Sequence, residues 1–433
     1  MKNITKGIAE SIMERRTSMD RLIFHIDVNS AFLSWEATER VLRGQEDIRL
    51  IPSAIGGDRE KRTGVILAKS IPAKKYGVTT GEPIAMALRK CPDLYLAKPN
   101  FRIYDKYSKA FMDICREYAP VVEKFSIDEC FLDMTGTSKL YPDPIAIAHT
   151  IKDRIREELG FTVNVGISSN KMLAKMASDF EKPDKVHTLF PEEIESKFWP
   201  LAVRDLISVG KSTAEKLEKH YIRTIGDLAK ADIVSLQRLV GNKLGQHIHN
   251  YANGMDESPV LHEREEVKGY SNSTTLEKDV TTREKAQEIL LALADSVGYR
   301  MRADKVKAYC VAVTIRGNDF KDHSHQRTLF NPTDITNEIY QVSIELFDEL
   351  WDGYTPLRLL GLALTNITHD DVSQMSLFAE QNEQKEKQKK VDKAMDELRS
   401  RFGSGVVTRG GAIQSSKRVG SKHKAQLDND IEK

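Results

Sequence analysis

Three acidic residues stand beside short apolar strand patterns, and their charge restricts how this chain can fold. Asp27 ends an apolar run at residues 22–28, and Asp128 and Glu129 lie between two strands expected within residues 121–135. Folding that gathers these side chains at one edge of a sheet brings like charges together, which requires a cation among them. Dense carboxylate oxygens select Mg²⁺ or Mn²⁺ over zinc. The pattern therefore predicts a divalent-cation site suited to phosphoryl transfer.

The order of the expected elements indicates an α+β fold in more than one domain. A chain of 433 residues exceeds what one hydrophobic core usually supports. In the first half, strand patterns alternate with amphipathic helices, one of which Asn100 is expected to cap, so the sheet should have helices packed on it. The expected strands there cover residues 22–28, 63–69, 94–97, 121–135 and 162–168.

The second half divides into a helical part and a smaller sheet domain. Between residues 191 and 254, short helices are separated by glycines, and residues 255–268 are charged and aperiodic, which predicts a linker. A capping box at Thr281 is expected to open a helix in a domain of one sheet and two helices. Its strands are expected at residues 270–275, 309–316, 326–330 and 359–366. After residue 378, a helical stretch rich in Gln, Lys and Glu leads into a polar tail.

Bulk composition argues against a uniformly basic protein and against a membrane-spanning one. The formal net charge is +1, so any nucleic-acid surface must be local to a domain. The four cysteines, at positions 91, 115, 130 and 310, lack the paired spacing of metal or disulfide sites. No apolar stretch approaches the ~20 residues that span a bilayer, and the N-terminus lacks a signal-peptide core. We therefore expect a cytoplasmic protein with no membrane partner.

Three sequence runs together resemble the motifs of one enzyme family. Residues 24–32 read FHIDVNSAF, residues 125–133 read FSIDECFLD, and residues 166–175 read GISSNKMLAK. Their content and spacing resemble the Y-family DNA polymerases over residues 21–367, and within that family the bacterial DNA polymerase IV and UmuC group. One sequence leaves the choice between these two branches open. Outside this context, the Asp-Glu pair would suit a solvated turn.

The resemblance implies a right-hand polymerase with palm, small fingers, helical thumb and a C-terminal little finger. The corresponding ranges are residues 1–20 for an N-terminal extension, 21–30 and 103–188 for the palm, 31–102 for the fingers, 189–255 for the thumb, 256–267 for a linker, 268–370 for the little finger, 371–380 for a clamp-binding peptide and 381–433 for a helical and disordered tail. The implied activity is error-prone translesion synthesis by a DNA-directed DNA polymerase. The implied partners of this monomer are primer-template DNA, deoxynucleoside triphosphates and a sliding clamp.

For the metal site, the resemblance implies two Mg²⁺ ions, with Mn²⁺ as an alternative. The implied ligands are Asp27, Asp128 and Glu129, joined by the main-chain carbonyl of Val28. Phe32 matches the steric gate, a ring that leaves no room for the 2′-hydroxyl of a ribonucleotide. Outside this context, Phe32 would be a core aromatic residue of the first helix.

The implied triphosphate site departs from the DNA polymerase IV pattern. Lys182 matches the family's triphosphate-binding lysine, whose ammonium can follow charge that builds on the leaving pyrophosphate. Where polymerase IV has a tyrosine and an arginine in the fingers, this chain has Ile71 and Lys74. Lys74 keeps a positive charge but loses the fork of arginine, and Ile71 has no hydroxyl. The UmuC-like branch matches better at these two positions.

DNA contacts are expected from two further segments. Residues 206–217 resemble a helix-hairpin-helix, in which Gly210 and Lys211 would face a DNA phosphate without reading sequence. Ser208 stands where that motif usually has its first glycine. Arg316 and Arg327 in the little finger would hold the duplex by its phosphates.

Residues 374–378, which read QMSLF, resemble the peptide that attaches bacterial polymerases to the sliding clamp. Gln374 would set the register through hydrogen bonds, while Leu377 and Phe378 would fill an apolar pocket. The alternative for this segment is a last turn of core structure.

Two rival functions account for part of the pattern. A palm-fold nucleotidyl cyclase also presents paired carboxylates on a sheet and binds a triphosphate, but it needs no thumb, little finger or clamp peptide. A catalytically weakened DNA-binding scaffold of the same fold is the second rival, motivated by Ile71 and Lys74. Only a polymerase uses all of the motifs.

Overall fold

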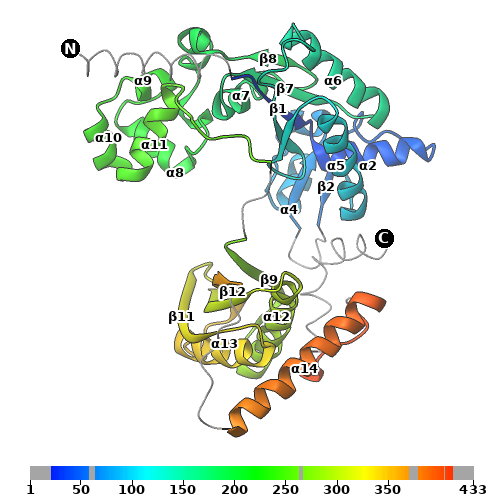
Figure 1. Cartoon of the computed structure of the whole chain (residues 1–433), viewed down its shortest axis with the longest axis vertical. Coiled ribbons are helices and arrows are strands. Elements are labelled where there is room, and N and C mark those ends of the chain that lie inside the picture. Colours follow the sequence, from blue (N-terminus) through cyan, green and yellow to red (C-terminus); the bar gives the residue numbers. More distant parts are fainter. Residues whose placement is uncertain (1–20, 58–63, 263–266, 370–378, 404, 413–433) are drawn as a thin grey trace. The chain divides into compact units, whose positions relative to one another are not determined.

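The strand that carries Asp27 lies in the middle of a five-stranded sheet with the order β5-β6-β1-β7-β8. Its strands β1, β7 and β8 are labelled in Figure 1. β1 pairs antiparallel with β6 on one side and with β7 on the other. The strands are β1 Ile23–Val28, β5 Val121–Lys124, β6 Glu129–Asp133, β7 Val163–Ser168 and β8 Val186–Thr188. All but β8 lie within strand ranges predicted from the sequence. β8 has only three residues, too few for a recognisable alternation.

This sheet belongs to the first of two compact units. The structure, a computed structural model, describes residues 21–57, 64–262, 267–369, 379–403 and 405–412. The first unit runs to residue 264 without residues 57–65, and the second contains the rest of the chain. Each unit has its own apolar core and mixes helices with a sheet, which confirms the predicted α+β fold class.

The two faces of the five-stranded sheet pack against different helices. Successive side chains of β1 point to opposite faces, so neighbouring residues contact different helices. The helices are α2 Ala31–Leu42, α5 Phe101–Arg116, α6 Pro144–Leu159 and α7 Lys171–Ser178. On one face, Phe24 and Ile26 pack with residues of α2, α5 and α6. On the other face, His25 contacts Ser178 of α7, and Asp27 contacts the chain just after that helix. The charged end of β1 is therefore covered by α7 and the loop that follows it.

α7 approaches the sheet most closely at Gly166 of β7. A Cβ atom built there would lie 1.9 Å from the carbonyl oxygen of Ala174 and 2.5 Å from the main-chain nitrogen of Ser178. Both are main-chain atoms, so no side-chain rotation could relieve the clash. Gly166 therefore sets the distance between α7 and the sheet, and with it the position of every side chain that α7 presents to β1.

A smaller three-stranded sheet, with the order β3-β2-β4, follows α2 in the chain. Its elements are β2 Ser53–Gly56, β3 Ile66–Lys69, α3 Ile71–Lys75, α4 Ile84–Lys90 and β4 Tyr95–Ala97. β3 and β4 lie within predicted strand ranges, whereas β2 is short and buried throughout, so it lacks an alternating pattern. Asn100 is the N-cap residue of α5, as predicted, but its side chain makes no capping hydrogen bond.

The part that was predicted to be helical contains only short helices and one isolated bridge, Ala202 with Thr224, among its described residues. These elements are η1 Pro191–Glu193, η2 Ile194–Phe198, η3 Val203–Asp205, α8 Lys211–Lys219, α9 Ile225–Ala229, α10 Ile233–Val240 and α11 Asn242–Ala252. Their apolar side chains share one core with α7. The helical part is thus packed directly on the helix that covers the charged end of β1.

The chain that leaves α11 stays attached to the first unit as far as residue 261. Val260 is buried against β1 and β6. Glu123 accepts hydrogen bonds from the Lys171 ammonium at 2.7 Å and from the main-chain nitrogen of Leu261 at 2.7 Å. The sequence predicts only a linker over residues 256–267, because one buried valine and a few main-chain contacts leave no periodic pattern.

The second unit contains a four-stranded antiparallel sheet with the order β11-β10-β12-β9. Its elements are β9 Gly269–Val280, α12 Arg283–Ala303, β10 Lys307–Gly317, β11 Asp322–Thr333, α13 Thr336–Leu350 and β12 Leu357–Thr368. This sheet with two helices is the arrangement predicted for this part of the sequence. The capping prediction is one residue too early, because Thr282 rather than Thr281 accepts the hydrogen bond from the nitrogen of Lys285.

The last long helix, α14 (Ala379–Phe402), is attached to α12 and α13 of the second unit by buried charged side chains. Arg399 contacts Asp295 of α12 at 2.5 Å, with only 7% and 10% of the two side chains exposed. Asp392 accepts a hydrogen bond at 2.9 Å from the main-chain nitrogen of Thr336, the first residue of α13. The short helix η4 (Gly410–Ala412) follows α14. A helix was predicted here, but the sequence alone does not tell which of its charges are buried.

Two predicted segments lie outside the described residues. They are the N-terminal extension at residues 1–20 and the expected clamp contacts Gln374, Leu377 and Phe378. None of the described helices is both long and apolar enough to cross a membrane.

Replacing Gly166 with alanine should lower the free energy of unfolding by on the order of 3 kcal/mol, because the added methyl must push α7 away from the sheet. Urea unfolding measures this change. Gly410→Ala is the matched control, since nothing lies within 4 Å of a Cβ at that position. A Gly166→Ala protein as stable as the parent would show that the close approach of α7 is not required.

Candidate active site

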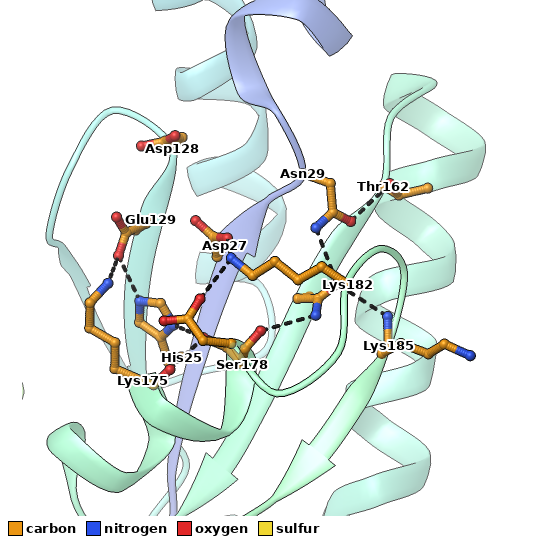
Figure 2. Close-up of polar contacts among 12 residues, drawn as sticks. His25, Asp27, Asn29, Asp128, Glu129, Thr162, Lys175, Ser178, Lys182 and Lys185 are labelled. Carbon is orange, nitrogen blue, oxygen red and sulfur yellow. Dashed lines mark hydrogen bonds and ion pairs between the residues drawn. The ribbon is translucent and has the colours of Figure 1, made fainter. Parts of the chain in front are cut away.

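The three acidic residues predicted to act together lie at the same end of two neighbouring strands (Figure 2). Asp27 of β1 and Glu129 of β6 are directly paired in the sheet. The main-chain nitrogen of Val28 donates to the carbonyl of Asp128 at 3.0 Å, which fixes the turn before β6. The Asp128 carboxylate accepts a hydrogen bond from the hydroxyl of Ser126 at 2.7 Å. The sheet register therefore brings together side chains that are a hundred residues apart in the sequence.

Two lysines supply positive charge to these carboxylates. Lys175 of α7 contacts Glu129, and Lys182 contacts Asp27 as well as Asp179, the latter at 2.8 Å. From the sequence, Lys175 is expected to line the solvent or DNA side of its helix, and this expectation is wrong. Here the close approach of α7 to the sheet turns it toward the acidic end instead.

His25 of β1 contacts both α7, through Ser178, and the Glu129 carboxylate of β6. Its ring is 1% exposed, with Nδ1 at 2.8 Å from the Ser178 hydroxyl and Nε2 at 3.0 Å from the Glu129 carboxylate. Burial lowers the pKa of His25, against the opposing effect of its hydrogen bond to Glu129. The Ser178 hydroxyl also donates to the main-chain carbonyl of Lys175 at 2.7 Å, so its single proton is shared between that carbonyl and Nδ1. His25 was not singled out from the sequence, although it lies two residues before Asp27 and so shares its face of β1.

The two paired carboxylates have opposite pKa shifts. Burial raises the pKa of Asp27 to about 6, with Lys182 opposing this effect and Glu129 and Asp128 adding to it. Burial also disfavours ionised Glu129, but hydrogen bonds from His25 and Lys175 outweigh it and lower the pKa of Glu129 to about 2. Asp27 is therefore the carboxylate whose ionised form would gain most from further positive charge nearby.

The donor chemistry of Asp27, Asp128 and Glu129 fits a hard divalent cation. Across the described ranges, no group of three or more His, Cys, Asp or Glu side chains already converges on one point. A cation would have to compete with Lys175 for Glu129 and with Lys182 for Asp27. The three residues thus fit an ion by their type and position, while Asp27 and Glu129 are at present in contact with ammonium groups.

Two buried asparagines, Asn29 (labelled in Figure 2) and Asn164, hold the loop that carries Lys182. Asn29 donates to the side chain of Asn164 at 3.1 Å and accepts from the main-chain nitrogen of Asp184 at 3.0 Å. Asn164 in turn donates to the carbonyl of Glu181 at 2.7 Å. The loop is therefore fixed on both sides of Lys182. Sequence reasoning missed both asparagines, although a polar residue at position 164, inside an apolar strand, was a usable signal.

A cavity of about 300 Å³ lies beside Asp27. The predicted triphosphate residues Lys182 and Lys74 both line it, and so does Ile71. Two further cationic residues that the sequence analysis did not consider, Arg49 and Lys69, also line the cavity. Positive charge therefore gathers around the space next to the carboxylates.

Phe32 lies in an aromatic cluster at the start of α2. Its ring is stacked on that of Tyr104, with centroids 4.6 Å apart and planes 10° from parallel. The rings of Trp35 and Phe101 lie at 6.0 Å and 6.2 Å. Phe32 is half-buried, so its ring is packed on one side and accessible on another. This placement suits a core aromatic residue, and the role of steric gate stays a prediction.

The turn that resembles a helix-hairpin-helix lies before α8. Gly210 is the N-cap of α8 and Lys211 is its first residue, and both are exposed. Ser208 has a φ of +74°, a left-handed conformation that glycine adopts without strain. The serine thus reproduces the conformation expected of the usual glycine, at a cost of about 1 kcal/mol.

The two arginines predicted to contact DNA are both engaged by carboxylates in the second unit. Arg316 of β10 pairs with Asp322 at 2.5 Å and 2.7 Å. Arg327 of β11 contacts Glu349 of α13 at 2.5 Å, on the sheet face that the helices cover. Their role in DNA binding stays a prediction.

Comparison with known proteins identifies relatives along most of the chain. Residues 26–179 match the model of the impB/mucB/samB family, and residues 267–377 match the C-terminal domain of that family. Residues 204–256 match a thumb domain described as that of DNA polymerase-iota.

Similar curated proteins carry the name DNA polymerase IV. The DNA polymerase IV of Clostridium acetobutylicum is 44% identical over 392 residues, which cover 90% of this chain and 98% of the relative. DNA polymerase IV 1 of Bacillus subtilis is 36% identical over 398 residues, 91% of this chain and 94% of the relative. A solved Y-family DNA polymerase chimera has the same fold, with a TM-score of 0.70, 23% identity, and coverage of 81% of this chain and 100% of that one.

Replacing Asn164 with alanine should lower the free energy of unfolding by about 2 kcal/mol, because buried main-chain groups lose their hydrogen-bond partners. Denaturant titration monitors the change. Asn100→Ala is the matched control, since that side chain makes no capping hydrogen bond. Equal stability of the two variants would mean that the asparagine pair does not hold the loop.

Proposed function

Because the chain belongs to the Y family of DNA polymerases, and is therefore a DNA-directed DNA polymerase, we propose that it extends primers past damaged template bases by nucleotidyl transfer at Asp27, Asp128 and Glu129. The resemblance recognised in three sequence motifs is thus confirmed at the level of the family. The sequence left the choice between the DNA polymerase IV and UmuC branches open, and the two curated relatives described above carry the DNA polymerase IV name.

The observation that carries the proposed mechanism is the direct pairing of Asp27 with Glu129 in the sheet, beside a cavity lined by cationic side chains. Divalent ions held by these carboxylates and by the carbonyl of Val28 would activate the primer 3′-hydroxyl and neutralise charge on the transferring phosphate. We propose two such ions, Mg²⁺ or Mn²⁺, as the cofactors.

Basic side chains around the cavity would hold the triphosphate of the incoming nucleotide. Lys182 lies against Asp27, so its ammonium can exchange that carboxylate for the phosphates as charge builds on the leaving pyrophosphate. Lys74 lines the same cavity and carries no ion pair within the part of the chain that the structure describes. These residues bind by charge, which does not depend on the base.

Error-prone synthesis is proposed from the small size of the fingers. The predicted range, residues 31–102, contains α2, a three-stranded sheet and two short helices, α3 and α4. Fidelity depends on contacts that sense the shape of the new base pair, and a small surface offers few of them. Distorted templates would then be accepted.

DNA would be held by two sequence-independent contacts. The exposed turn at Gly210 and Lys211 suits a phosphate, and Arg316 and Arg327 would exchange their carboxylate partners for phosphates of the duplex. Such contacts weaken as salt is added. Attachment to a sliding clamp through Gln374, Leu377 and Phe378 would offset low processivity.

We propose that the enzyme works as a cytoplasmic monomer. The four cysteines are free thiols and all are buried, which suits a reducing compartment. A nucleotidyl cyclase would not need the thumb and C-terminal domains that this chain matches. A primer-extension assay distinguishes a catalytically weakened scaffold from an active polymerase.

Asp27→Asn and Glu129→Gln should each slow primer extension with Mg²⁺ by at least about a hundredfold, because several kcal/mol of transition-state stabilisation are lost with a metal ligand. Single-turnover extension of a primer-template measures the rate. Asp113→Asn, which changes an exposed carboxylate on α5, should leave it unchanged. Absence of extension by the unmodified protein would favour the scaffold instead.

Phe32→Ala should raise incorporation of ribonucleotides relative to deoxyribonucleotides by on the order of tenfold or more, because the ring that excludes the 2′-hydroxyl is gone. The ratio of kcat/KM for the two sugars measures it. Leu42→Ala, a change at an exposed position at the end of α2, is the control. An unchanged ratio in Phe32→Ala would leave Phe32 as a core residue only.

A further inference from the structure

The cavity beside Asp27 carries more positive charge than the family resemblance assigns to it. Its lining includes the basic residues Arg49, Lys69, Lys74 and Lys182, and Asp27 is the one carboxylate among the lining residues that the structure describes. A space of about 300 Å³ with this balance suits a compact polyanion.

Two of the four basic residues are already held by acids. Lys182 contacts Asp27 and Asp179. The guanidinium of Arg49 makes three hydrogen bonds with the Asp47 carboxylate, at 2.9 Å, 3.1 Å and 2.8 Å. Neither of these cations is free to attract an anion without giving up a carboxylate.

Lys69 and Lys74 differ from them in having no carboxylate partner in the described ranges of the chain. The ammonium of Lys69 donates to the hydroxyl of Thr80 at 3.2 Å, a neutral acceptor. Glu82, the acid whose charge acts on Lys69, is itself bound to Lys90 at 2.6 Å. Two uncompensated ammonium groups therefore border the same cavity.

The two ammonium groups lie close enough to repel each other. Burial lowers the pKa of Lys69, and the charge of Lys74 lowers it further, with Glu82 opposing the shift. Adjacent like charges of this kind are stabilised when an anion binds between them. The pair is thus poised for a ligand that carries several negative charges.

The turn that carries both lysines is rigid. Ser70, between β3 and α3, accepts hydrogen bonds from the main-chain nitrogens of Ala73 at 3.1 Å and Ser53 at 3.0 Å. Its hydroxyl donates to the carbonyl of Ile51 at 2.8 Å. Because the turn is held in place, the main chain of both lysines already lies at the wall of the cavity. Ligand binding therefore costs less conformational entropy.

We propose that Lys69 is a triphosphate-binding residue, which acts together with Lys74 to hold the phosphates of the incoming nucleotide. The proposal rests on the proposed polymerase function. It also accounts for the departure at Ile71 and Lys74, because a second ammonium from β3 compensates for the tyrosine hydroxyl and the arginine fork that those two positions lack. Since ammonium groups bind phosphate as point charges, the contribution is the same for all four bases.

Lys69→Ala should raise the KM for each of the four deoxynucleotides by about tenfold, as expected when one charge-assisted contact to a phosphate is lost. The kcat should change less than about twofold, because the contact is made to the bound nucleotide as well as to the transition state. Lys69→Arg, which keeps the charge, should restore KM to near the parent value. Steady-state primer extension at fixed ionic strength measures both constants.

Lys75→Ala is the matched control, because Lys75 is an exposed lysine on α3 that does not line the cavity. Its KM should equal that of the parent. An unchanged KM in Lys69→Ala, or a change confined to kcat, overturns the proposal. A KM that rises for one base only also overturns it.

A second measurement separates this inference from the proposed function. Inorganic tripolyphosphate, used as a probe without base or sugar, should raise the melting temperature of the parent and of Lys75→Ala, and should raise that of Lys69→Ala much less. If the parent fails to extend primers but shows this pattern, the polymerase proposal fails and the anion-binding role of Lys69 stands. If the parent extends primers and tripolyphosphate stabilises Lys69→Ala as much as the parent, the role of Lys69 fails alone.

Discussion

Negative charge gathered at one end of a sheet is the constraint on which the first unit depends. Asp27 and Glu129 are paired across β1 and β6, and such a pair is tolerable only with positive charge beside it. The chain supplies that charge from α7 and from the loop behind it, through Lys175 and Lys182. Both lysines reach the carboxylates because α7 lies against the sheet where β7 has a glycine. Sheet register, helix position and loop position are therefore parts of one electrostatic arrangement.

The sequence predicted the fold class, most strands of the five-stranded sheet and the family. These features have strong local signals, because apolar periodicity and motif spacing are properties of neighbouring residues. The grouping of Asp27 with Asp128 and Glu129 could also be predicted, since each lies at the end of a recognisable strand. The described part of the chain places all three at one end of β1 and β6.

What the sequence could not show are the partners of individual polar side chains. Nothing near Lys175 distinguishes a lysine that faces Glu129 from one that faces solvent, because the difference depends on how closely α7 approaches the sheet. Lys69 looked like the polar end of a strand, and only the folded turn places it beside Lys74 at a cavity. Asn164 could have been noticed as a polar residue in an apolar strand, but the loop that it holds comes later in the chain. Contacts of this kind depend on tertiary structure rather than on periodicity.

The attachment of α14 has a consequence for how that helix could detach. Among its described residues, the side chains that it buries against the rest of the second unit are the charged Asp392 and Arg399 and one apolar residue, Met395, while Val391, Leu398 and Phe402 on the same helix are exposed. Separation of α14 would therefore break ion pairs and uncover mainly charged groups, which water can solvate readily. Such an opening exposes little apolar surface and therefore changes the heat capacity little. We expect α14 to detach as a local unit without causing the sheet domain to aggregate.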